Sequence, residues 1–136
     1  MNRKNILVAA NPAVRDMFLA VLEPLNASTT FCHTVEDAES FLLAGECDLI
    51  ICTLQFDESR WAELLQFVRA TPSCSLTPFL VLKVSQGLLT ESLIEASLKS
   101  AKLIGASETV NFPAWRRELG DAEAVQALRD LIHSLL

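Results

Sequence analysis

The chain has 136 residues, a length that suits one compact domain, and we predict a single domain over residues 1–136. Hydrophobic residues make up 51% and charged residues 21%, close to the averages for soluble globular proteins, so an intrinsically disordered chain is excluded. The net charge of −6 and the lack of a Lys/Arg run argue against a nucleic-acid partner. No stretch approaches the roughly 20 apolar residues of a membrane span, and the first apolar run, residues 6–10, is too short for a signal peptide. We therefore expect a cytoplasmic protein with no membrane partner.

Short apolar runs alternate with amphipathic stretches along the chain. The runs are typical of strands that are buried on both faces of a sheet, and the stretches show the spacing of helices with one apolar face. Strands are predicted at residues 5–10, 28–32, 49–54, 78–84 and 108–112. Helices are predicted from Asn11 to Pro24, from the N-cap Thr34 to Gly45, from Trp61 to Thr71, over residues 92–103 and from a cap at Asp121 to the C-terminus. Five strand–helix units predict an α/β fold, because each right-handed crossover returns the chain over the sheet. The expected architecture is a doubly wound, five-stranded parallel sheet with helices on both faces, as in flavodoxin-like folds.

The sequence lacks the patterns of the common catalytic and cofactor sites. The four cysteines (Cys32, Cys47, Cys52 and Cys74) do not form a CxxC pair, and only Cys32 has a neighbouring histidine, His33. We expect Cys47 and Cys52 to be small core residues that flank a strand. With four glycines in the chain, no phosphate-cradling glycine loop is present. We therefore expect no metal, no cofactor and no enzymatic activity.

Three stretches together resemble the receiver (CheY-like) domain of bacterial response regulators. Residues 6–15 (ILVAANPAVR) are similar to the family's first strand, acidic pair and following Pro. Residues 47–54 (CDLIICTL) resemble its third strand, and residues 103–113 (LIGASETVNFP) resemble its Gly-Ala turn, fifth strand and Lys-Pro ending. The resemblance covers nearly the whole chain and implies a role in two-component signal transduction or a phosphorelay.

In receivers, as the resemblance implies, five polar positions at the strand ends carry the chemistry. An acidic pair holds Mg²⁺, an Asp accepts the phosphoryl group, and a Ser or Thr and a Lys contact the phosphoryl oxygens. On this chain the acidic pair falls on Ala9 and Ala10, the acceptor on Thr53, the Ser/Thr on Lys83, the Lys on Phe112 and the aromatic switch residue on Thr109. Pro113, which in the family follows a cis peptide bond, is retained. A dianionic phosphoryl group beside a carboxylate needs a compensating cation, and Mg²⁺ can supply that charge only where carboxylate oxygens bind it. The missing carboxylates therefore predict a degenerate pseudo-receiver.

Three functions follow, in order of preference. The first is a phosphorylation-independent signalling module that acts through protein–protein interaction. The second is a small-ligand sensor that uses the vacated pocket around Ala9, Ala10, Thr53, Lys83 and Phe112. The third is a conventional phosphoacceptor.

Lys83 allows two structural interpretations. Its ammonium group pairs with Asp57 or Glu58 in the loop after the third strand, or its stem lies on apolar surface while its charge reaches water.

The expected partner is a signalling protein or a second copy of this chain, as in a homodimer. By resemblance the interface lies on the face of the fourth helix, fifth strand and last helix, here residues 92–102, 108–112 and 121–136. Thr109, Trp115 and Arg116 are candidate interface residues, because Trp and Arg are enriched in interface hot spots. The interval from Lys83 to Gly105 is longer than is usual in the family and falls in the same region.

Overall fold

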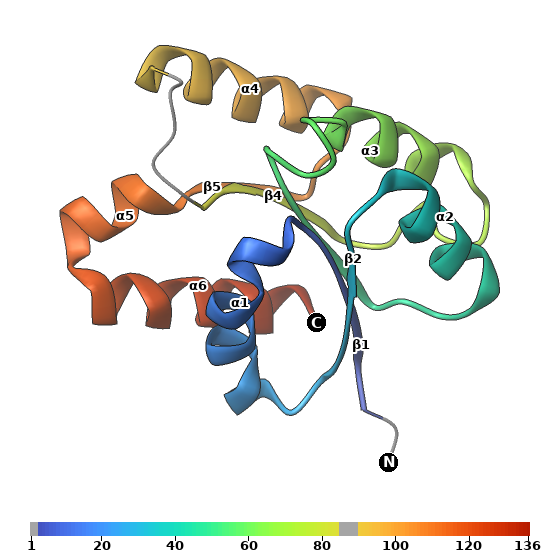
Figure 1. Ribbon diagram of the computed structural model, residues 1–136, viewed down its shortest axis with the longest axis horizontal. Helices are drawn as coiled ribbons and strands as arrows, with labels where there is room; N and C mark the ends of the chain where they lie inside the picture. The colour runs from blue at the N-terminus through green and yellow to red at the C-terminus, as the bar shows by residue number, and fades with distance from the viewer. Residues whose placement is uncertain (1–2, 85–89) are drawn as a thin grey trace.

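A computed structural model describes residues 3–84 and 90–136, and its centre is one parallel sheet (Figure 1). The strand order is β2-β1-β3-β4-β5, the order of flavodoxin-like doubly wound folds. The strands are β1 (Asn5–Ala9), β2 (Ser28–Cys32), β3 (Leu49–Thr53), β4 (Phe79–Lys83) and β5 (Glu108–Asn111). The five predicted strands and the fold class are therefore confirmed. Part of the long interval between Lys83 and Gly105, residues 85–89, lies outside the described residues.

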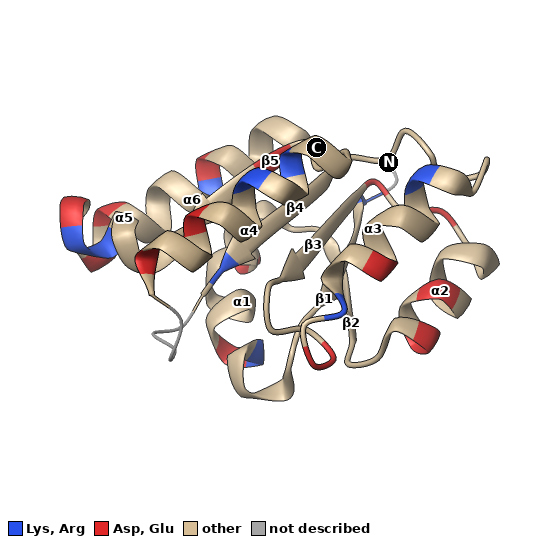
Figure 2. Ribbon diagram, turned by 90° about the horizontal axis from the view of Figure 1, so that it is seen from above, with Lys and Arg blue, Asp and Glu red and all other residues tan. Residues whose placement is uncertain are grey.

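Helices cover both faces of the sheet. Their bounds are α1 (Arg15–Leu22), α2 (Val35–Ala44), α3 (Trp61–Ala70), α4 (Glu91–Ile104), α5 (Phe112–Leu119) and α6 (Asp121–Leu135), and the 3-10 turns η1 (Pro12–Val14) and η2 (Glu23–Leu25) flank α1. The side chains of α2, α3 and α4 pack in one buried cluster with one face of the sheet, and those of α1 and α6 pack with the other face. Figure 2 shows the charged residues mostly on the helices and loops, with few of them on the strands.

Local signals explain several element boundaries. The Thr34 side chain accepts the Asp37 N–H at 3.1 Å and caps α2, as its residue type predicts. All five residues of β3 are buried, which fits a central strand between two layers of helices. Cys52 lies within this strand, and the half-buried Cys47 packs against the same core cluster.

The end of β5 differs from the prediction. β5 stops at Asn111, and α5 begins at Phe112, where the end of a strand was expected. The Asn111 side chain accepts the Ala114 N–H at 3.2 Å, so it caps α5. Pro113 lies in the first helical turn, where its fixed φ angle fits, and the peptide bond before it is trans rather than the cis bond of the resembling family.

The expected cap at Asp121 is also wrong. Gly120 precedes α6 with a φ of 84°, and the Asp121 carboxylate makes no capping hydrogen bond within the described part of the chain. Asp121 is the first residue of α6, where its negative charge still interacts favourably with the positive end of the helix dipole.

Candidate functional site

The candidate site is the edge of the sheet where the parallel strands end. In the strand register Ala9 lies beside Cys52, Thr53 beside Leu82, and Lys83 beside Asn111. Because the carboxyl ends of parallel strands lie at one edge, the positions selected from the sequence are neighbours in the fold.

These positions divide between the two faces of the sheet. Residues that lie side by side on adjacent strands point to the same face, and successive residues along a strand alternate. Ala9 belongs to the core cluster of α2, α3 and α4, and the alternation after Val81 places Lys83 on that face. Ala10 and Phe112 belong to the cluster of α1 and α6, and Thr53 shares the face of its neighbour Leu82.

The side chains at the selected positions are buried. The exposed fractions are 0% for Ala9, 1% for Ala10, 5% for Thr53, 1% for Lys83 and 1% for Phe112. Two of these, Lys83 and Phe112, are among the largest fully buried side chains of the described residues. The side chains at these positions are therefore buried in the fold, and a ligand pocket around them stays a prediction.

Lys83 is the least expected of these side chains. Its Nζ is buried and has no hydrogen-bond partner among the described residues. Neither interpretation from the sequence holds, since the amine pairs with no loop carboxylate and does not reach water. Burial disfavours the ammonium form and lowers the pKa of Lys83.

Asp57, one of the two loop acids that were considered as partners of Lys83, is engaged elsewhere. The Asp57 carboxylate accepts the N–H of Val35, the first residue of α2, at 2.9 Å and also binds Arg60 at 2.9 Å. Arg60 further pairs with Glu36 at 2.8 Å and with Glu63. The Arg60 guanidinium donates to Glu36 and lowers the pKa of that carboxyl. These ion pairs tie the loop after β3 to α2 and α3.

The same loop has an unusual backbone. Three successive residues, Asp57, Glu58 and Ser59, have φ angles of 44°, 56° and 66°. This left-handed region costs roughly 1–2 kcal/mol for each residue that carries a Cβ. The contacts of Asp57 and Arg60 hold the loop in this shape beside the candidate edge.

Asn111 connects this edge to α4 and was not selected from the sequence. Its amide nitrogen lies 3.0 Å from Glu91 Oε2, and Arg117 on α5 binds the other oxygen of Glu91 at 2.6 Å. Asn111 thus caps α5 and joins it to α4 through Glu91. The order Asn-Phe-Pro is a signal that could have predicted it, because Asn is a favoured N-cap and Pro favours the first helical turn.

A groove lies between α4, β5 and α5, and it overlaps the α4 and β5 parts of the face predicted as an interface but not residues 121–136. Its volume is about 370 Å³, and its lining residues are Glu95, Leu98, Lys99, Thr109, Asn111, Ala114, Trp115 and Glu118. Thr109 and Trp115, two of the three candidate interface residues, therefore line one groove. The third, Arg116, is half-buried and places its guanidinium 5.2 Å from the centre of the Phe112 ring. Trp61 is half-buried on α3 and packs against the core cluster of α2, α3 and α4.

The residues at this edge do not fit a magnesium ion. Mg²⁺ prefers carboxylate oxygens, and the positions that supply them in receivers carry the methyl side chains of Ala9 and Ala10. Within residues 3–84 and 90–136, no three His, Cys, Asp or Glu side chains form a group that could hold a metal. Nor does any helix in these ranges have the length and apolar character needed to cross a membrane.

The architecture and strand order are those of receiver domains. No protein-family model matches the sequence, and no curated protein matches it. Among solved structures, the chain is similar to a response regulator from Hahella chejuensis, with a TM-score of 0.74, 19% identity and coverage of 96% of this chain and 92% of that one. It is also similar to the chemotaxis protein CheY4 of Vibrio cholerae, with a TM-score of 0.71, 17% identity and full coverage of both chains.

A third similar structure is the receiver domain of a sensor histidine kinase from Pseudomonas aeruginosa, which was determined with a magnesium ion in its active-site cleft. Its TM-score is 0.65 at 16% identity, with coverage of 95% of this chain and 99% of that one. At these identities the likeness establishes the fold. What the fold does in this chain depends on the residues at its strand ends.

Proposed function

We propose that this chain is a receiver-type signalling module that acts by protein–protein contact and does not depend on phosphoryl transfer. The observation that carries the proposal is the buried, unpartnered amine of Lys83 at the position where receivers have a phosphate-contacting hydroxyl. A receiver's active edge is open and acidic, because metal and phosphate must enter it. The corresponding side chains here are apolar or buried and leave no carboxylate to accept a phosphoryl group.

The charge balance supports the same conclusion. A phosphoryl group on a side chain beside other acids is stable only with a cation close by, and the metal ligands are missing. Thr53 is 5% exposed, so its hydroxyl also lacks the access that a phosphodonor needs. The signalling state of this module is therefore set by which protein it binds.

The groove between α4, β5 and α5 is the proposed contact surface. Trp115 supplies aromatic area, and Glu95, Lys99 and Glu118 give the groove mixed charge. Central aromatic residues with a polar rim are typical of protein interfaces. We expect the protein that binds this groove to belong to a signalling pathway.

Treatment with acetyl phosphate and Mg²⁺ tests the phosphorylation claim. Intact mass and the near-ultraviolet signal of the two tryptophans, Trp61 and Trp115, are recorded before and after, with a conventional receiver as the positive control. We expect no mass gain and no spectral change for this chain. A phosphorylated species that Thr53→Ala removes would refute the proposal.

The contact surface is tested by capture from the native cell with Trp115→Ala as bait. A specific bound protein is expected with the wild type and is expected to be lost with this variant. Leu76→Ala changes a 93% exposed apolar residue outside the groove, so this matched control is expected to retain the bound protein. Equal binding by all three baits would place the contact elsewhere.

A further inference from the structure

One edge of the sheet is unusually free of protection. β2 and β5 are the two edge strands. β5 carries Glu108, which pairs with Lys102 at 3.8 Å, whereas the sequence of β2, STTFC, contains no charged residue and no proline. Edge strands of stable monomers are commonly blocked by charges, Pro or bulges, because their open main-chain groups pair readily with other strands.

The hydrogen-bond pattern shows which groups of β2 are open. The Ser28 N–H donates to the Lys4 carbonyl at 2.7 Å, and the Cys32 carbonyl accepts the Ala10 N–H at 3.2 Å. In a parallel ladder the residues alternate between facing the neighbouring strand and facing away from it. Thr29 and Phe31 therefore direct their N–H and C=O groups away from β1, and no other described residue hydrogen-bonds to them.

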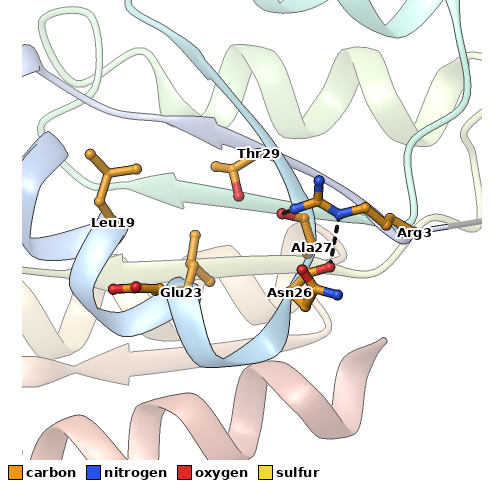
Figure 3. A pocket seen from close by; sticks show the side chains of 7 residues that line it. Arg3, Leu19, Glu23, Asn26, Ala27 and Thr29 are labelled. Atoms are coloured by element: carbon orange, nitrogen blue, oxygen red, sulfur yellow. Dashed lines mark hydrogen bonds between the residues drawn. The ribbon is translucent and has the colours of Figure 1, made fainter.

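Grooves lie on both sides of this edge. A groove of about 450 Å³ between α1 and β2 is lined by Leu19, Leu22, Ala27, Thr29, Glu23 and Arg3, among others (Figure 3). On the α2 side, a groove of about 330 Å³ is lined by Ser28, Thr30 and Phe41, among others. Figure 1 shows β2 with α1 on one side and α2 on the other. A strand added to β2 would place alternate side chains in the two grooves.

We propose that the open edge of β2 pairs antiparallel with β2 of a second copy of this chain, with the two-fold axis at Thr30. In this register Thr29 faces Phe31 of the second copy, and Phe31 faces its Thr29. Both residues have open main-chain groups, so each of these two pairs forms two hydrogen bonds, about four in all. A shift of the register by one residue, which places the axis between two residues, would set open groups against groups already bonded to β1.

The side chains and charges fit the second copy in the same register. Phe31 of the second copy lies over Thr29 and enters the groove beside Leu19, which is 42% exposed in the single chain. The Arg15 guanidinium lies over the Phe31 ring, 4.6 Å from its centre. In the dimer, Arg15 of the second copy would therefore lie next to the groove that its Phe31 enters. Glu23 lines the receiving groove, so the two-fold symmetry brings two Arg15–Glu23 pairs together across the contact.

The contact is small, since each strand has five residues. An interface of this size belongs to the weak, concentration-dependent class. We therefore expect monomers and dimers to exchange at micromolar to millimolar concentrations. This surface is separate from the groove at β5, so the dimer does not rest on the function proposed above.

A disulfide cross-link tests the register. Directly opposed side chains in an antiparallel pair have Cβ atoms about 4.5–5.5 Å apart, close to disulfide geometry. Thr30→Cys is expected to give a covalent dimer on mild oxidation, and Thr109→Cys on the opposite edge strand is the matched control. The wild type, which has four thiols, sets the background. A cross-link in Thr109→Cys but not in Thr30→Cys would overturn the proposal.

Charge reversal tests the pairing in solution by analytical ultracentrifugation. Glu23→Arg is expected to weaken the dimer at least about tenfold, Arg15→Glu to do the same, and the double reversal to restore it. Glu118→Arg, on α5, is the control and should leave the dimer unchanged. Hydrogen exchange at the Thr29 and Phe31 amides is expected to slow as the protein concentration rises. A monomer at every concentration, or a dimer weakened only by Glu118→Arg, would refute the β2 contact, and so would binding of an added extended peptide without self-association.

Discussion

Replacing Lys83 by Met is the substitution that most directly tests the description of the candidate edge. Met has a similar length but no amine, so the apolar stem keeps its place while the unpartnered nitrogen disappears. Burying a polar group without a hydrogen bond costs about 1–3 kcal/mol. We therefore expect Lys83→Met to raise the free energy of unfolding at neutral pH by about 1–3 kcal/mol. For a chain of this length, each kcal/mol corresponds to a rise in Tm of about 3–5 °C.

The pH dependence of the same pair of proteins gives a second signature. Burial lowers the pKa of Lys83 below its ordinary value of 10.5, so between the two pKa values the unfolded chain binds more protons than the folded one. Stability of the wild type then rises with pH through this window, and the destabilisation is fully present below the folded pKa. The advantage of Lys83→Met is therefore expected to shrink as the pH approaches 10.5.

Buried thiols act in the opposite direction over part of the same range. Burial raises the pKa of Cys47 from 9.0 to about 11, so its contribution to stability is present below pH 9 and is lost as the pH rises through the folded value. Both proteins carry the same cysteines. The difference between their unfolding free energies therefore isolates Lys83.

The assay is urea unfolding followed by tryptophan fluorescence, repeated from pH 7 to pH 10. Lys99→Met, on the exposed side of α4, is the matched control and is expected to change the unfolding free energy by less than about 0.5 kcal/mol. If Lys83→Met destabilises the protein, or if its gain grows with pH, the buried and unpaired state of Lys83 is wrong.

Three further predictions concern the surrounding scaffold, each measured by the same unfolding assay. Glu58→Gly is expected to stabilise the protein by about 1 kcal/mol, because Gly adopts a φ of 56° without strain, whereas Glu39→Gly inside α2 is expected to cost about 1 kcal/mol. Similar effects at both sites would contradict a left-handed Glu58. Arg69→Leu is expected to cost about 2–4 kcal/mol, since Arg69 donates to three main-chain carbonyls at 2.7–3.0 Å, and a neutral effect would mean that water replaces it. Asn111→Ala is expected to lower the free energy of unfolding by about 1–2 kcal/mol through the lost cap of α5. Asn111→Asp can still cap α5 but repels Glu91, so its free energy of unfolding is expected to lie between those of the wild type and Asn111→Ala. Equal losses for the two Asn111 variants would exclude the capping role.

The hydrophobic pattern predicted the strands and most helices because burial on two faces requires continuous apolar runs. Strand β2 was placed at its observed bounds, and the other predicted strands end within a residue or two of theirs. The helix α5 was missed because the resemblance placed a strand end and a Lys-Pro turn at Phe112 and Pro113. A capping Asn and a Pro in the first turn outweigh the β-prone residues that precede them.

That the acidic, hydroxyl and lysine positions of receivers are replaced was implied by the resemblance, from residue type alone. The environment of those residues was not. Alternation along parallel strands places Lys83 and Thr53 on opposite faces, and this follows only from the register.

The sequence by itself predicted an α/β chain, since composition and periodicity are local properties, and its resemblance to receivers implied that Ala9, Ala10 and Thr53 stand where that family carries carboxylates. Only the tertiary structure decided that Lys83 is buried without a partner, that Asp57 binds Arg60, and that β2 forms an uncharged edge. These features depend on which segments, distant in sequence, come together, and the strand order β2-β1-β3-β4-β5 sets those neighbours. The residues of one strand do not specify which strands lie beside it in the sheet.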